Sequence, residues 1–113
     1  MLPKRRKPSR LGLKDRPQAR IPGHLQFVRG HECSINSALC DGPIEAAHAR
    51  SGTDGALGVK PSDWWALPLC ALHHRIQHDI GEKQFEHNHS IDMKKIAQAL
   101  WQRSPHRRKW EDG

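Results

Sequence analysis

The chain has 113 residues, of which 35% are hydrophobic and 5% aromatic, and this composition predicts one small domain with a thin apolar core. No stretch approaches the ~18 apolar residues of a membrane helix, and no apolar signal segment follows the N-terminus, so we expect a cytoplasmic protein without membrane partners. The three cysteines are an odd number, which argues against a disulfide framework and, in a reducing compartment, favours metal binding.

The net charge of +7 is concentrated at the N-terminus. Residues 1–20 carry eight basic residues and one acidic residue, whereas residues 21–100 hold seven basic and nine acidic residues. Four prolines interrupt residues 1–22, and we expect this segment to be a disordered basic arm. The arm either contacts DNA phosphates or only keeps the protein soluble. The residues expected to make the DNA contacts are Lys4, Arg5, Arg6 and Lys7.

The rest of the chain divides into a central domain at 23–90 and a C-terminal helix with a basic tail at 91–113. In chain order, the pattern predicts a short helix or strand at 24–29, a loop at 33–40, a strand at 44–49, a glycine-rich loop at 51–60, a strand at 65–69, a helix at 70–80, a short helix at 83–87 and a final helix from the Asp92 cap to about residue 102. Pro105 is expected to stop that last helix.

Two ligand pairs have the spacing of a zinc site. Six residues separate Cys33 from Cys40, and Cys70 lies three positions before His73. Zinc prefers four sulfur or nitrogen ligands in a tetrahedron, which two such pairs can supply. His31 is an alternative ligand, and three buried thiols beside a surface histidine are the alternative to any site. A structural zinc ion would also support the thin core, because its binding energy is folding energy.

A second histidine group lies on the predicted helix at 70–80. His74 and His78 are spaced i, i+4, so they share one helix face and can hold one metal ion. The adjacent His73 points about 100° away, which leaves it for the zinc site. His48 lies at the end of the predicted strand at 44–49, immediately before the glycine-rich loop.

Five short segments occur in an order that resembles a known family. They are Ala47-His48-Ala49-Arg50, Lys60-Pro61-Ser62-Asp63, Pro68-Leu69-Cys70, His73-His74 and residues 81–86. The order is similar to that of the HNH or ββα-metal endonucleases, and most similar to small phage and prophage nucleases of the recombination-enhancement type. The match covers about residues 25–90. It implies an α+β fold, a treble-clef-like ββα-metal finger with a zinc knuckle and flanking helices.

The resemblance implies a role for each matched residue. His48 matches the general base, and a histidine with a near-neutral pKa can take a proton from water. Asp63 matches the middle position, which is usually Asn and orients the base. His74 and His78 match ligands of the catalytic metal.

Two positions depart from the family pattern. Many members have a metal-binding Asp or His where this chain has Ala47, and Asp63 replaces the usual Asn. Asp63, Glu45 or water is then left to complete the metal site.

These roles predict metal-dependent hydrolysis of DNA phosphodiester bonds. The catalytic ion would be Mg²⁺ or Mn²⁺, or else Zn²⁺ or Ni²⁺, acting as a Lewis acid on the leaving oxygen. Arg50 and Arg75 beside the site either hold phosphates or are solvated. The alternatives are a zinc-stapled DNA-binding module without catalysis and a recombination accessory protein whose cutting needs a recombinase filament. Trp64 and Trp65 are expected to pack in the core or at its rim rather than to stack on a base.

Overall fold

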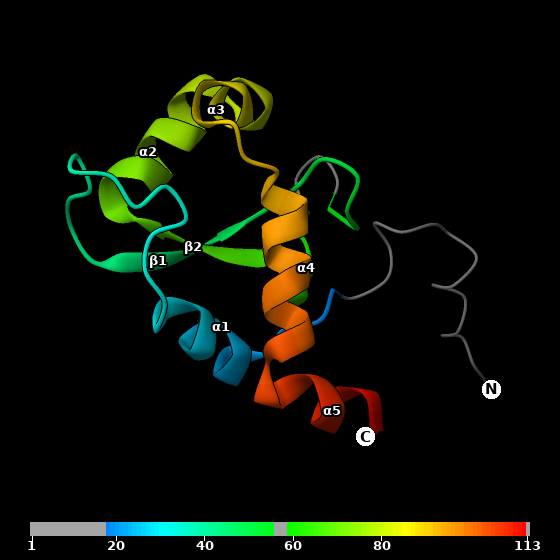
Figure 1. The fold of residues 1–113 in the computed structure, drawn as a ribbon. Helices are drawn as coiled ribbons and strands as arrows, with labels where there is room; N and C mark the ends of the chain where they lie inside the picture. The colour runs from blue at the N-terminus through cyan, green and yellow to red at the C-terminus, as the bar shows by residue number, and fades with distance from the viewer. Residues whose placement is uncertain (1–17, 56–58, 113) are drawn as a thin grey trace.

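A two-stranded antiparallel sheet lies at the centre of this small α+β fold, with helices around it (Figure 1). The structure is a computed structural model that describes residues 18–55 and 59–112. Its elements are α1 (Pro22–Arg29), β1 (Ile44–His48), η3 (Asp63–Trp65), β2 (Ala66–Cys70), α2 (Ala71–Ile80), α3 (Glu82–His89), α4 (Met93–Arg103) and α5 (Pro105–Asp112). The two predicted strands and the helix after them are present, with their bounds within one residue of those expected.

The hairpin and α2 form one continuous unit. In the register of the sheet, Ala47 lies opposite Leu67 and Ile44 lies opposite Cys70. Cys70 ends β2 and is also the N-cap of α2, where its sulfur accepts a hydrogen bond from the His73 backbone N–H. The chain therefore passes from strand to helix without an intervening loop.

Adjacent residues of β1 pack into different apolar clusters, as the alternation of a strand requires. Ala47 belongs to the larger cluster, which also contains Leu67, Leu69, Phe85 and Met93. The neighbouring Ala46 packs against a smaller cluster of Val28, Ala66 and Leu100. The sheet is therefore covered by α1 and α4 as well as by α2 and α3.

The expected boundary of the N-terminal arm at residue 22 is wrong. α1 begins at Pro22, a residue suited to the first position of a helix. Before it, Ala19 and Ile21 are buried, and the Ala19 N–H donates to the Ser62 hydroxyl oxygen. The ordered domain thus includes residues 18–22, and the remainder of the predicted arm, residues 1–17, lies outside the described residues.

The expected basic tail is helical. α4 begins at the Asp92 cap and ends at Arg103, as predicted, but Pro105 then begins α5. A proline stops one helix and is equally suited to the first turn of the next, which explains the error. None of the described helices has both the length and the apolar character of a membrane span.

α1, α4 and α5 meet around His24, which is fully buried. Its Nδ1 lies 2.9 Å from the Ser104 hydroxyl oxygen, and its ring packs edge-on against Trp101. Its Nε2 is buried with no hydrogen-bond partner among the described residues. Burial, aided by the neighbouring His106, lowers the pKa of His24 to about 4, so the folded protein holds this imidazole neutral.

We expect His24 to cost the protein stability as the pH falls below about 6.5. The unfolded chain then binds a proton at its ordinary pKa, whereas the folded chain does not until about pH 4. At pH 5 this loss is about 2 kcal/mol. Urea unfolding at pH 7.5 and pH 5 measures it, with His24→Gln as the comparison. Between pH 7.5 and pH 5, the free energy of unfolding of the variant should fall by about 2 kcal/mol less than that of the wild type. Equal falls would contradict the argument.

Candidate metal centre and histidine site

Three cysteines and one histidine from separate segments meet in one group. Cys33 and Cys40 come from the loop between α1 and β1, Cys70 ends β2, and His73 lies in the first turn of α2. Their ligand atoms all lie within 4.8 Å of one another. The Sγ atoms of Cys33, Cys40 and Cys70 lie 3.7, 3.6 and 3.1 Å from His73 Nδ1. The structure thus brings together the four residues predicted to bind zinc.

His31, the alternative ligand, lies elsewhere. Its Nδ1 is 2.9 Å from the Phe27 carbonyl oxygen of α1, and its ring packs edge-on against the Phe27 ring. It is therefore committed to α1 and does not belong to the group.

Backbone hydrogen bonds hold the cysteine loop against α2. The N–H groups of Ala71 and Leu72, which have no partner inside the helix, donate to the carbonyl oxygens of Pro43 and Asp41. Gly42 between them has φ +85°, and a Cβ atom added there would lie 2.7 Å from the Ala71 Cβ. Only glycine permits this close approach, which places Cys40 beside the start of the helix.

The Cys33 side of the loop is tied to β2. Both the backbone N–H and the hydroxyl group of Ser34 donate to the carbonyl oxygen of Pro68, each at 2.8 Å. Because Pro68 has no N–H of its own, this strand offers only its carbonyl to the loop at that position. Cys33 is thereby placed next to Cys70.

The group fits a tetrahedral metal ion such as zinc. Zinc–sulfur and zinc–nitrogen distances of about 2.3 and 2.0–2.1 Å separate a sulfur from a nitrogen ligand by roughly 3.5 Å, close to the sulfur–nitrogen distances here. The N–H groups of Ser37 and His73 donate to the sulfurs of Cys40 and Cys70, both at 3.4 Å. Burial lowers the pKa of His73, which leaves its imidazole neutral and able to bind a metal.

His48 and Asp63 form the second feature, a hydrogen-bonded pair. His48 Nε2 lies 2.9 Å from Asp63 Oδ1, and Asp63 is only 1% exposed. Burial lowers the pKa of His48, although the contact with Asp63 acts in the opposite direction. The imidazole is therefore neutral near pH 7 and can accept a proton.

The N-terminal segment holds the Asp63 carboxylate in place. The Ile21 N–H donates to Asp63 Oδ2 at 2.7 Å, and an Arg20 Nη1 atom lies 3.6 Å from Asp63 Oδ1. The Arg20 guanidinium also donates to the carbonyl oxygens of Pro61 and Lys60. Sequence analysis missed this role because it counted Arg20 with the basic arm, and no local pattern distinguishes it from the arginines before it.

Glu45, His74 and His78 form the third feature. Glu45 Oε1 lies 2.8 Å from His74 Nδ1, and His74 Nε2 lies 3.2 Å from His78 Nε2. The predicted histidine pair is therefore together, and Glu45 sets its geometry. A carboxylate on one ring nitrogen fixes the tautomer and orients the other nitrogen, as at many metal-binding histidines.

The two histidine groups lie on different sides of β1. Glu45 and His48 are three residues apart on the strand, so their side chains leave it on opposite faces. Ala47, between them, is fully buried in the larger apolar cluster. The position where the resembled family often has a ligand is thus filled by core packing in this chain.

The arginines expected to contact DNA have different surroundings. The Arg50 side chain donates to the Val59 carbonyl oxygen at 3.1 Å, and its backbone N–H donates to Glu82 Oε1 at 2.8 Å. Glu82, which sequence analysis did not single out, thereby joins the segment after His48 to α3. Arg75 is exposed on α2. Lys4, Arg5, Arg6 and Lys7 lie outside the described residues.

Comparison of the chain with family models, curated proteins and solved structures found no match.

We expect the purified protein to hold about one tightly bound metal ion per chain. Cys70→Ser removes one of the four ligands, so both the metal content and the melting temperature should fall, because metal binding contributes directly to folding. Elemental analysis and thermal unfolding measure the two effects. His89→Ala is the control, since its ring lies 5.5 Å from that of His73 but outside the group. A metal-free protein with a Cys33–Cys40 disulfide would contradict the expectation.

Proposed function

We propose that this protein is a metal-dependent endonuclease that hydrolyses DNA phosphodiester bonds, similar in plan to the HNH or ββα-metal nucleases. The proposal is carried by one observation. A hairpin–helix unit presents both a histidine braced by a buried carboxylate and a histidine pair oriented by a second carboxylate. Phosphodiester hydrolysis needs a base that activates water and a cation that stabilises the leaving oxygen. In this proposal His48 supplies the base, and His74 and His78 hold the cation.

His48 is the proposed base. Its side chain is 11% exposed, so a ring nitrogen can reach solvent at the edge of the domain. Asp63 holds Nε2, which fixes the ring and stabilises the positive charge that forms when Nδ1 takes a proton. Arg20 and the Ile21 N–H, which both contact Asp63, are positioning groups for the base.

His74 and His78 are the proposed ligands of the catalytic ion. Their Nε2 atoms face each other across 3.2 Å, and Glu45 holds the far side of the His74 ring. Because Ala47 contributes no ligand, two nitrogens leave most of the coordination positions open to water and a phosphate oxygen. Such an open site suits an ion that acts as a Lewis acid. Two imidazole nitrogens favour Zn²⁺ or Ni²⁺, whereas Mg²⁺ or Mn²⁺ would be held mainly by water and phosphate oxygens.

One substrate strand can meet both groups. β1 is an edge strand, because the sheet has only two strands among the described residues. Three residues of a strand span about 10 Å, so Glu45 and His48 lie one short step apart along that edge. Because the two side chains leave β1 on opposite faces, a DNA strand along this edge would meet the base and the metal-binding pair at different phosphates, whereas hydrolysis of one bond needs both at the same phosphate. This separation favours the second candidate described below.

The Cys33, Cys40, Cys70 and His73 group has a separate, structural role in this proposal. Four protein ligands complete a tetrahedral zinc ion and leave no position for a substrate. Cys33, Cys70 and His73 are also buried. A zinc ion here would stabilise the hairpin–helix junction and take no part in hydrolysis.

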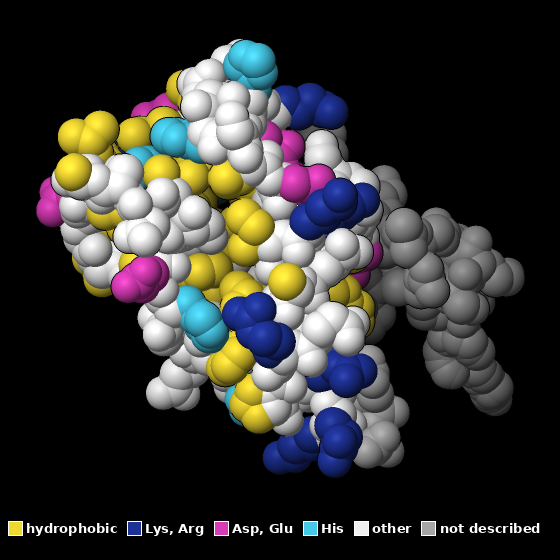
Figure 2. All heavy atoms as spheres, in the orientation of Figure 1, with side chains coloured by type: hydrophobic (Ala, Val, Ile, Leu, Met, Phe, Trp, Pro, Cys, Tyr) yellow, Lys and Arg dark blue, Asp and Glu magenta, His cyan; other side chains and the backbone are white. Residues whose placement is uncertain are grey.

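The charge of the molecule favours nucleic acid as the substrate. Lys and Arg side chains are spread over the region of α4 and α5 in the view of Figure 2. Seven further basic residues lie in residues 1–17, against a single acidic residue. Positive surfaces and arms of this kind gather DNA through its phosphates.

A DNA-binding module without catalysis is the second candidate. It is favoured by Ala47, whose burial removes the ligand that the resembled family often has at this position. Such a module needs the four-ligand group but has no use for His48 or His78, and that difference separates the two candidates by experiment.

We expect His48→Ala to reduce DNA cleavage by about 10²- to 10⁴-fold, because it removes the base but no metal ligand. His78→Ala should also lose activity, but raised divalent ion should partly restore it, since only metal affinity has fallen. Supercoiled-plasmid nicking in Mg²⁺, Mn²⁺, Zn²⁺ and Ni²⁺, with and without a recombinase filament, measures both. His87→Ala, an exposed histidine on α3, is the control. Full activity of His48→Ala would exclude the mechanism, and a wild type inactive under every condition would favour the binding module.

We expect removal of residues 1–17 to weaken DNA binding and to make it less dependent on salt. The segment carries seven basic residues and one acidic residue. For each phosphate that the segment neutralises, its removal should make the slope of log K against log salt shallower by about 0.9. Fluorescence anisotropy of a labelled duplex between 50 and 200 mM salt, about the range over which such effects are large, measures the slope. An unchanged slope would show that the arm does not contact phosphates.

A further inference from the structure

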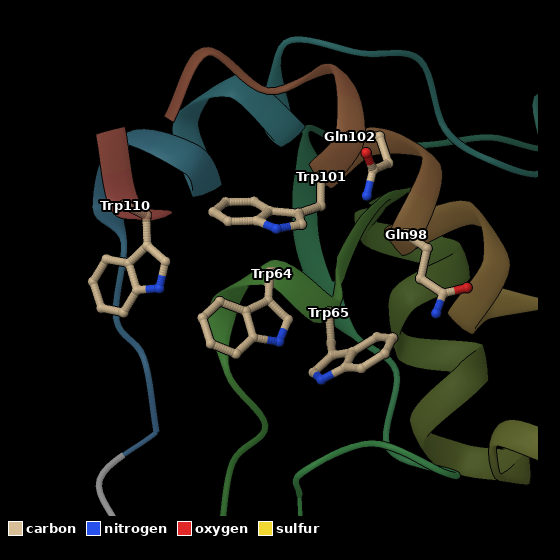
Figure 3. Close-up of a pocket in the computed structure, with 6 residues that line it drawn as sticks. All are labelled: Trp64, Trp65, Gln98, Trp101, Gln102 and Trp110. Atoms are coloured by element: carbon tan, nitrogen blue, oxygen red, sulfur yellow. The ribbon is translucent and has the colours of Figure 1, made fainter. Parts of the chain in front are cut away.

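All four tryptophans of the chain line a single hollow. They come from positions far apart in the sequence, Trp64 and Trp65 on η3, Trp101 on α4 and Trp110 on α5. Figure 3 shows Trp64 between Trp65 and Trp110, with Trp101 above it. The hollow has a volume of about 410 Å³, which is within the range of small-ligand sites.

The indole rings are not packed as a closed core. The ring centroid of Trp64 lies 5.8 Å from that of Trp101 and 6.0 Å from that of Trp110, at interplanar angles of 45° and 63°. Neither of these two pairs is stacked face to face. Trp110 is 45% exposed, and Trp64, Trp65 and Trp101 are only partly buried. Part of each tryptophan side chain is therefore open to solvent, where another planar apolar group can pack on it.

The remaining lining is polar and the surroundings are basic. Gln98 and Gln102 lie one helical turn apart on α4 and complete the hollow. At the other end, Trp110 is shared with an adjoining hollow that Arg20 and Lys109 line. Cationic side chains thus lie beside the Trp110 end of the aromatic platform.

We propose that this hollow binds unpaired bases of a single-stranded nucleic acid. Bases stack on aromatic side chains without regard to sequence, and lysines beside such a platform hold the backbone phosphates. The two glutamines add amide donors and acceptors of the kind that contact base edges. The inference rests on the proposed function for the class of its ligand. It adds that the protein engages a strand whose bases are exposed, through a site separate from His48 and His74.

The charges argue against the other common ligand of an aromatic cluster. Cages of tryptophan also bind quaternary ammonium groups through their ring faces. Arg20 and Lys109 beside this hollow would repel such a cation, whereas they attract a phosphate. An anionic ligand with a planar apolar ring would stack on the indole rings and would also be attracted to the basic side chains beside them.

The composition of the chain provides a direct readout. The chain has four tryptophans and no tyrosine, so its intrinsic emission comes from the rings of this hollow. Wild-type protein without added divalent ion is titrated with a 12-nucleotide single strand, with the same strand in a blunt duplex, with adenosine monophosphate and with choline. We expect the single strand to quench the emission at the lowest concentration, and the duplex to bind with little quenching.

Two variants of Trp110 test whether its indole ring stacks on a base. Trp110→Ala should weaken single-strand binding in anisotropy by a factor on the order of 5 to 150, the effect of losing one stacked base. Trp110→Phe should restore part of the affinity because it keeps an aromatic face. Ile80→Ala, which removes another exposed apolar side chain at a distance from the hollow, should change nothing.

Several results would overturn this inference. They are equal quenching by the duplex, binding of adenosine monophosphate as tight as that of the strand, quenching by choline, or no quenching at all. The experiment also separates this site from the nuclease. Quenching by a protein that cuts no DNA would support the hollow and contradict the proposed catalysis, whereas cleavage without quenching would do the reverse.

Discussion

The attachment of the cysteine loop to the junction of β2 and α2 is the constraint on which the rest of the structure depends. Within five residues, this junction ends the sheet, caps the helix, supplies two ligands of the four-ligand group and places His74. Whatever holds Cys33 and Cys40 against Cys70 and His73 therefore also sets the direction of α2. A thin core alone would fix that direction weakly, and a metal ion bound by this group would add free energy of folding without requiring more apolar residues.

The two carboxylate–histidine pairs depend on this frame in different ways. Glu45 reaches His74 because the register of the hairpin brings β1 alongside the start of α2. Asp63 reaches His48 because η3 begins where the loop returns to the sheet, and residues 20 and 21 close over it from the other side. One pair is therefore set by the sheet and its helix, the other by contacts between segments distant in sequence.

Sequence analysis placed the side chains whose relative positions depend on short spacing along the chain. It missed the contacts between residues that are far apart in sequence. The relative positions of Cys70, His73, His74 and His78 on about two turns of helix could be predicted, because helical periodicity fixes their directions. The role of Arg20 could not, since it arises from carbonyl groups 40 and 41 residues later in the chain. The position of Trp110 beside Trp64 depends in turn on α5, which was expected to be a tail. Hydrophobic periodicity is a weak predictor of helices in polar segments that lack an apolar stripe, such as α5.

The closeness of the three sulfurs has a consequence for handling the protein. Ligand atoms within 4.8 Å of one another are near enough for oxidation to join two of the thiols with small movements of the chain, which would leave the third without a partner. A bound ion would prevent this by coordinating all three thiolates. Loss of the ion and exposure to air would therefore act together, and a chelated sample would need a reductant before it could be reloaded. A metal ion bound here would therefore protect the cysteines from oxidation as well as fix the geometry around them.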